Sequence, residues 1–110
     1  MQATLMNPER LDLVSFDPTV GEYALIISAL DAWDDSEEEQ VLLLRKINNY
    51  LNFVTDGGFS EHFPDSRGRS TRIQIDSAAV LPPNAERIVT QAQVLLQPHG
   101  LRLCVNLIGQ

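Results

Sequence analysis

The chain has 110 residues, of which 44% are hydrophobic and 21% are charged, the proportions of an ordinary globular protein. This length suits one domain with a core of its own. Fifteen acidic residues against eight basic ones give a net charge of −7, which argues against nucleic acid as a partner and suits a basic protein or peptide.

Cysteine content and hydropathy narrow the class of protein further. Cys104 is the only cysteine, so we expect no intrachain disulfide and no cysteine-rich metal site. The first ten residues lack the basic segment and apolar core of a signal peptide, and no apolar run reaches the ~18 residues of a membrane span. The sequence therefore predicts a cytoplasmic protein with no membrane partner, and no motif in it calls for a cofactor.

The first third of the chain reads as a lead-in followed by two strands. Residues 1–10 contain a turn signal and are expected to be loose. A short apolar strand is expected over residues 11–16, and the turn residues within 17–21 predict a hairpin loop. Residues 23–30 are the most continuously apolar stretch, which predicts a central strand that is buried on both faces.

A long amphipathic helix then organises the chain. Ser36 is a plausible N-cap, and Glu39 three residues later completes a capping-box pattern. Gly57 supplies a left-handed stop at the other end. The apolar residues between them recur at helical spacing, as expected for one buried face, at Leu43, Leu44, Ile47, Tyr50, Leu51 and Val54.

The remainder of the chain completes an α/β (α+β) fold. Residues 57–70 read as a loop, 71–77 as an alternating half-buried strand, 84–97 as a second helix with Asn84 as its N-cap, and 101–108 as a last strand. The order is ββαβαβ. It predicts a two-layer sandwich in which two helices pack on one face of a four-stranded mixed sheet, within a single domain over residues 11–110.

The long helix begins in an acidic cluster. Helix capping on a solvated charged surface is the interpretation we favour, since carboxylates are stabilised at the positive end of the helix dipole. Docking of a basic partner and binding of a divalent cation are the alternatives. The spacing does not match the twelve-residue calcium loop, and we assign no metal ligand. The cluster comprises Asp31, Asp34, Asp35, Glu37, Glu38 and Glu39.

Three apolar side chains could extend the acidic cluster into a candidate interaction surface. Trp33 lies between the acidic residues and could be a core anchor, which we favour, or an exposed recognition residue. Leu42 and Phe53 fall outside the apolar arc of the long helix. Either a neighbouring loop covers them, the favoured interpretation, or they flank a binding surface.

Other polar groups give weaker signals. Arg67, Arg69 and Arg72 surround a glycine turn that could bind a phosphate or carboxylate, but no nucleotide motif accompanies them, and a surface turn is favoured. His62 lies in no recognised catalytic order, and we assign no catalytic residue. Cys104 reads as a small half-buried residue on the last strand.

Three segments together resemble a known family. They are LDAWDD at residues 30–35, LLRKINNYLNF at residues 43–53, and Phe63-Pro64. The family is an uncharacterised group of short bacterial proteins with a strand, an Asp-x-Trp turn and a helix that reads roughly LLxxKINxYLxF. The resemblance implies this order of elements and a bacterial origin, and it assigns no activity.

The hypothesis that we favour is a small acidic protein that binds another protein and performs no chemistry of its own. An inhibitor of a basic partner, as immunity proteins and antitoxins are, is one form of it. A small metal-dependent or accessory enzyme that uses Asp31, Asp34, Asp35 and His62 is the second hypothesis, and it requires a pocket where the acidic cluster meets the His62 loop. The third is a structural homo-oligomer that pairs edge strands or the open sheet face.

Overall fold

The computed structural model describes residues 2–109. Its strands are β1 (Leu13–Asp17), β2 (Glu22–Ala29), β3 (Thr71–Ser77) and β4 (Arg102–Leu107). Its helices are α1 (Glu37–Thr55), α2 (Gly58–His62) and α3 (Pro83–Leu96). Short 3-10 segments are η1 (Ala3–Met6), η2 (Pro64–Ser66) and η3 (Gln97–His99). Apart from α2, this is the ββαβαβ order that the sequence predicts.

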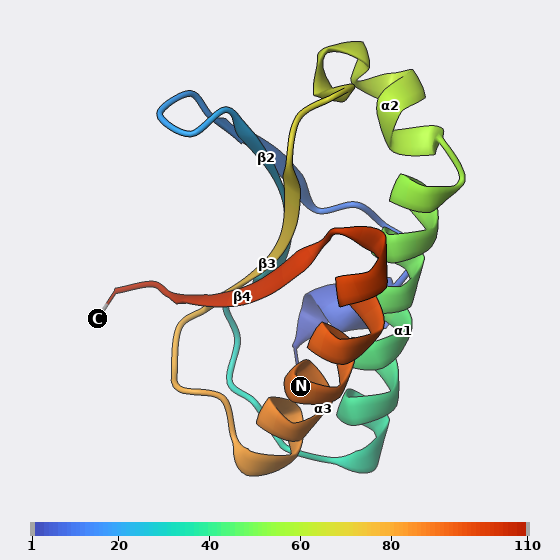
Figure 1. Cartoon of the computed structure of the whole chain (residues 1–110). Coiled ribbons are helices and arrows are strands. Elements are labelled where there is room, and N and C mark those ends of the chain that lie inside the picture. Colours follow the sequence, from blue (N-terminus) through green and yellow to red (C-terminus); the bar gives the residue numbers. More distant parts are fainter. Residues whose placement is uncertain (1, 110) are drawn as a thin grey trace.

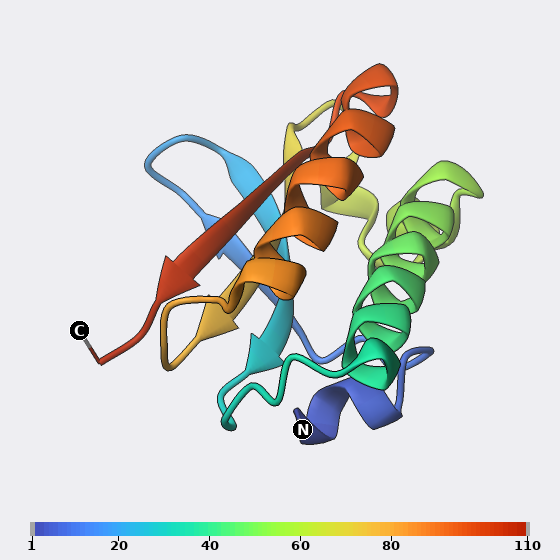
Figure 2. The same cartoon turned by 90° about the horizontal axis from the view of Figure 1, so that it is seen from below.

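The four strands form one mixed sheet in the order β1-β2-β3-β4. β1 pairs antiparallel with β2, whereas β2–β3 and β3–β4 are parallel and are connected through α1 and α3. Both long helices cover the same face of the sheet and leave the other face open (Figure 1). Seen from below, α1 and α3 lie side by side on that face (Figure 2). The predicted two-layer sandwich is confirmed.

The core lies between the sheet and the two helices. β2 is a central strand, as its continuous apolar run predicts, and Leu25 and Ile27 on its inner face are fully buried. Ile73 and Ile75 of β3 are equally buried, while the alternating polar residues of this strand face the open side. Burial of each such side chain contributes about 1.5–3 kcal/mol, so the sheet–helix interface supplies most of the cohesion.

The end of α1 shows one element that the sequence does not predict. Gly57 has φ +89°, the left-handed stop expected after the helix. The chain then makes the single turn of α2 inside the expected loop, and Phe59 of that turn is buried. The Phe59 ring lies 5.7 Å from the Tyr23 ring and 5.3 Å from the Phe63 ring, so α2 closes this end of the core.

The N-cap of α3 lies two residues earlier than predicted. Pro82 occupies the N-cap position and Pro83 the first helical position, where the missing proline N–H costs nothing. Asn84 is therefore inside the helix, and its side chain bonds another element, as described below.

The expectation of a loose lead-in over residues 1–10 is wrong for the part that the structure describes. Leu5 is completely buried in the core. The side-chain amide of Gln2 donates to the carbonyl of Asp31 and accepts a hydrogen bond from its N–H. The turn signal is real, but η1 packs against α1 and β2. The Cα radius of gyration is 13.4 Å, close to the roughly 13 Å expected for one compact domain of this length.

Candidate functional site

The first turn of α1 has the predicted N-cap but only half of the predicted capping box, because the N–H of Ser36 donates to Asp34 and not to Glu39. Ser36 has extended backbone angles, and its hydroxyl accepts a hydrogen bond from the N–H of Glu39 at 3.1 Å, as predicted. Glu39 is buried, and its carboxylate accepts hydrogen bonds from the N–H groups of Asp34 and Asp35 at 3.2 and 2.9 Å. Glu39 therefore fastens the connection between β2 and α1.

Asp34 also serves this connection. Its carboxylate accepts hydrogen bonds from the N–H and the hydroxyl of Ser36, at 2.9 and 2.7 Å. These bonds, the backbone one first, hold the pKa of the Asp34 carboxyl below its usual value. The carboxylate is thus held in its charged form beside the positive end of the helix dipole.

Asp35 and Asp31 join the start of α1 to other parts of the chain. Asp35 has φ 56°, a left-handed conformation that aspartate tolerates better than most residues. One Asp35 oxygen accepts a hydrogen bond from Asn84 of α3 at 3.1 Å, while Oδ1 is buried without a hydrogen-bond donor among residues 2–109. Asp31 accepts a hydrogen bond from the N–H of Ala3 at 3.0 Å. Both carboxylates therefore have structural roles.

Asp31 and Asp34 are exposed but hydrogen-bonded, whereas two further exposed acidic residues form no side-chain hydrogen bond among residues 2–109. Glu37 and Glu38 are exposed, and none of the ion pairs among residues 2–109 involves either of them. They line a shallow hollow of about 580 Å³ over the first turns of α1, together with Val41, Leu42 and one exposed basic residue, Arg45. Val41 is 55% exposed, so the hollow combines carboxylates with accessible apolar surface. We call Glu37, Glu38, Val41 and Leu42 the acidic surface.

The other apolar candidates are covered. Trp33 packs partly buried against the core, and its indole N–H donates to the hydroxyl of Ser77 at 3.0 Å. Phe53 also packs against the core, and α2 covers it, with the Phe59 and His62 rings 6.1 and 5.7 Å away. Trp33 is therefore an anchor of the sandwich, and Phe53 does not belong to the same surface as Leu42.

The three arginines do not converge on one site. Arg69 lies over the Phe16 ring at 5.2 Å and donates to the carbonyl of Asp65. Arg67 is exposed on the same turn. Arg72 instead lies on the open face of the sheet, where it donates to Glu22 at 2.8 Å. Strand alternation separates Arg72 from the turn, so the anion site suggested by the sequence is not assembled.

Charged groups on the open face of the sheet neutralise one another. Glu22 accepts hydrogen bonds from Arg72 and Arg102. Burial tends to raise the pKa of Glu22, but these two arginines outweigh it and hold the pKa below its usual value. Cys104 on β4 is half-buried, as predicted, and burial raises the pKa of its thiol.

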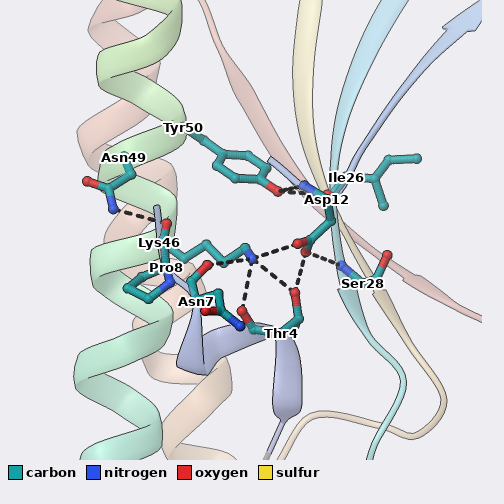
Figure 3. Close-up of polar contacts among 9 residues, drawn as sticks. All are labelled: Thr4, Asn7, Pro8, Asp12, Ile26, Ser28, Lys46, Asn49 and Tyr50. Atoms are coloured by element: carbon teal, nitrogen blue, oxygen red, sulfur yellow. Dashed lines mark hydrogen bonds and ion pairs between the residues drawn. The ribbon is translucent and has the colours of Figure 1, made fainter. Parts of the chain in front are cut away.

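A buried polar cluster around Lys46 is the main feature that the sequence interpretation misses (Figure 3). The Lys46 side chain is fully buried, and its ammonium lies 2.8 Å from Asp12 Oδ1. It also donates to the carbonyls of Thr4 and Asn7, at 3.0 and 3.3 Å, and to the Thr4 hydroxyl at 2.9 Å. Three residues from the N-terminal part of the chain thus surround one cation of α1.

Tyr50 completes this cluster from the next turn of α1. Its hydroxyl donates to the carbonyl of Ile26 at 2.9 Å and accepts a hydrogen bond from the N–H of Asp12 at 3.0 Å. Burial raises the pKa of Tyr50, so the phenol stays protonated. Lys46 lies three residues after Leu43 and four before Tyr50, on the buried arc of α1. A charged residue at that spacing is the signal that could have revealed the cluster.

The structure does not assemble the alternative enzyme site. Asp31, Asp34 and Asp35 precede α1, whereas His62 follows it. The 19 residues of α1 extend about 28 Å, so no pocket brings His62 to the acidic cluster. Within residues 2–109, no group of three or more His, Cys, Asp or Glu side chains is placed to hold a metal ion. None of the helices of that part of the chain is long and apolar enough to cross a membrane.

Comparison with known proteins gives one match. No curated protein and no solved structure is similar to the chain at a significant level. A family model described as a family of unknown function (DUF6572) matches residues 3–109, which include both the acidic surface and the Lys46 cluster. The resemblance to an uncharacterised family is thereby confirmed, and the chain belongs to the family DUF6572.

Proposed function

We propose that this protein is a non-catalytic binding module whose partner is a basic protein. The observation that carries the proposal is the acidic surface on the first turns of α1. There, exposed Glu37 and Glu38 border a hollow that also contains the apolar side chains of Val41 and Leu42. Charged groups that surround an accessible apolar centre are typical of protein-recognition surfaces.

The different roles of the acidic residues support this proposal. Glu39, Asp34 and Asp35 each accept hydrogen bonds that hold the connection before α1. Glu37 and Glu38 are not needed for that connection, and they project from the positive end of the helix dipole into solvent. Their charges are therefore available to a partner.

The net charge of −7 favours the same kind of partner. A negative protein attracts a positive one over about a Debye length and orients it before contact. An inhibitor that covers a basic surface, as immunity proteins and antitoxins do, is the concrete form that we propose. The apolar side chains of Val41 and Leu42 would then supply contact area that persists at high salt.

The test is an affinity capture from the source cell with a charge-matched control. The bait proteins are wild type, the double variant Glu37→Gln/Glu38→Gln, and the control Glu9→Gln/Glu61→Gln. Both variants lose two negative charges, and Glu9 and Glu61 are exposed residues outside the acidic surface. We expect wild type and the control to retain one basic protein that the Glu37/Glu38 variant loses.

The captured protein is then purified and titrated against all three baits. Affinity that falls with salt for wild type, and less steeply for the Glu37/Glu38 variant, supports contact at the acidic surface. Equal loss in both variants would mean that net charge alone attracts the partner. Capture of nothing, or a partner held equally by all three baits, would contradict the proposal.

A further inference from the structure

β4 is an edge strand whose backbone groups are turned to solvent on one side. Its neighbour on the other side is β3, and the N–H of Ile108 donates to the carbonyl of Ser77 at the end of that strand. Backbone groups alternate in direction along a strand. The N–H and C=O groups of Leu103, Val105 and Leu107 therefore point to the free edge.

Gln93 of α3 supports this assignment. Its side-chain amide reaches past the helix and donates to the carbonyl of Leu103 at 3.0 Å. A carbonyl oxygen accepts two hydrogen bonds, so this contact leaves room for a further donor from an added strand. The edge is covered by one side chain at its beginning and is open from Val105 onward.

Apolar surface accompanies the open part of the edge. Val105, Leu107 and Ile108 are 37, 40 and 42% exposed, and Val80 beside them is 72% exposed. Val80, Val105 and Leu107 line a hollow of about 460 Å³ between α3 and β4, together with Leu81 before α3 and with residues of α3 that include Val89. An exposed edge strand beside apolar side chains is a template for a further strand.

The side chains along this edge indicate which strand fits. Leu103, Val105 and Leu107, whose backbone groups point to the free edge, are all apolar, and Val105 and Leu107 are exposed. About a two-fold axis at Val105 this row of apolar residues lies opposite itself, so an antiparallel copy of β4 complements the edge.

We propose that two copies of this chain pair antiparallel along β4, about a two-fold axis at Val105. Leu103 then lies opposite Leu107 of the second copy, and the two Val105 residues face each other. The two four-stranded sheets become one continuous sheet with all long helices on the same side. The exposed apolar residues of both hollows leave water together.

The first test is sedimentation equilibrium over a range of concentrations at physiological ionic strength. Wild type is expected to pass from monomer to dimer as concentration rises. Val105→Lys places two positive charges face to face on the axis and should remain monomeric. The control Val20→Lys, at the exposed tip of the β1–β2 hairpin, should dimerise like wild type. Far-ultraviolet circular dichroism verifies that both variants are folded.

A wild type that stays monomeric at every concentration overturns the proposal. So does a folded Val105→Lys variant that dimerises as wild type does. The hollow at β4 shares no lining residue with the acidic surface, so Glu37→Gln/Glu38→Gln should dimerise normally. Failure of the dimer therefore leaves the proposed function standing, and the reverse also holds.

The second test fixes the register with a disulfide. In the proposed pairing Cys104 lies opposite Asn106 of the second copy, at a position without backbone hydrogen bonds. Such pairs have Cα atoms about 4.5 Å apart, which a disulfide can span. Asn106→Cys, oxidised with glutathione disulfide, should give a covalent dimer on a non-reducing gel. Ser15→Cys on β1, an exposed control, should not. Equal yields of covalent dimer from both variants, or none from Asn106→Cys, would overturn the register.

Discussion

Two charged regions of α1 have opposite relations to the rest of the molecule. At its first turn, Glu37 and Glu38 are exposed and take part in none of the ion pairs among residues 2–109. Less than three turns later, Lys46 is fully buried, and its ammonium contacts four oxygen atoms of other segments. The comparison teaches that charged residues of one helix can either be buried and hold the fold together or stay exposed on the surface.

The largest loss of stability is expected from a substitution in the buried region around Lys46. Lys46→Met removes the cation and leaves the Asp12 carboxylate beside apolar surface without its counter-charge. Removal of one partner from a buried ion pair costs about 3–5 kcal/mol of unfolding free energy. Urea unfolding measures this loss. The neighbouring exposed residue provides the control, since Arg45→Met should change stability by no more than about 0.5 kcal/mol.

A double variant separates charge from packing in this region. In Lys46→Met/Asp12→Asn the side chain at position 12 is neutral but can still accept the hydrogen bond from Ser28. Part of the stability lost in Lys46→Met should return. If the double variant is less stable than Lys46→Met, the cost does not come from an uncompensated carboxylate.

A smaller effect is expected at the edge of the same cluster. Tyr50→Phe keeps the ring but removes the hydroxyl that links the N–H of Asp12 to the carbonyl of Ile26. Buried groups left without a partner cost about 1–3 kcal/mol, and urea unfolding should show a loss in this range. A loss below about 0.5 kcal/mol would mean that water replaces the hydroxyl and that the cluster is less closed than its geometry indicates.

The same two regions show what a single sequence can reveal. Local periodicity identifies α1 and the strands, and the bounds of β3 coincide with the predicted residues 71–77. The Ser36–Glu39 pattern identifies the N-cap of α1, because both partners lie within one turn. The single turn of α2 is too short to be detected from hydrophobic periodicity. Its structural role, which is to bury Phe59, is visible only in the folded protein.

The Lys46 cluster could not be predicted in the same way. Its ammonium meets Thr4 and Asp12, which are 42 and 34 residues away in the chain. No local pattern specifies such a meeting, although a lysine on the apolar arc indicates that a partner must exist. The structural role of Asp35 could not be predicted for a related reason. Its positive φ and its hydrogen bond from Asn84 arise only from tertiary structure.

The contribution of Glu22 to stability is expected to depend on pH. Its pKa in the folded protein lies below the ordinary value of 4.5, through Arg102 and Arg72. The stability that it contributes is therefore complete above about that pH and is lost as pH falls through the folded pKa. Wild type should be more stable than Glu22→Gln at neutral pH, and the difference should shrink in acid. Urea unfolding along a pH series gives the comparison, and a difference that stays constant with pH would exclude the charge of Glu22 as its source.

The smallest effect is expected at the exposed region and bears most directly on function. Glu37→Gln/Glu38→Gln removes only favourable interactions with the helix dipole, worth about 0.3–1 kcal/mol for each charge at low salt and less as salt rises. The capping bonds of Ser36 and Glu39 do not involve these side chains and should persist. Urea unfolding at low and high salt tests this. A salt-independent loss as large as that of Lys46→Met would show that the two glutamates are structural. A small, screened loss is the result that the proposed recognition role of the two glutamates requires.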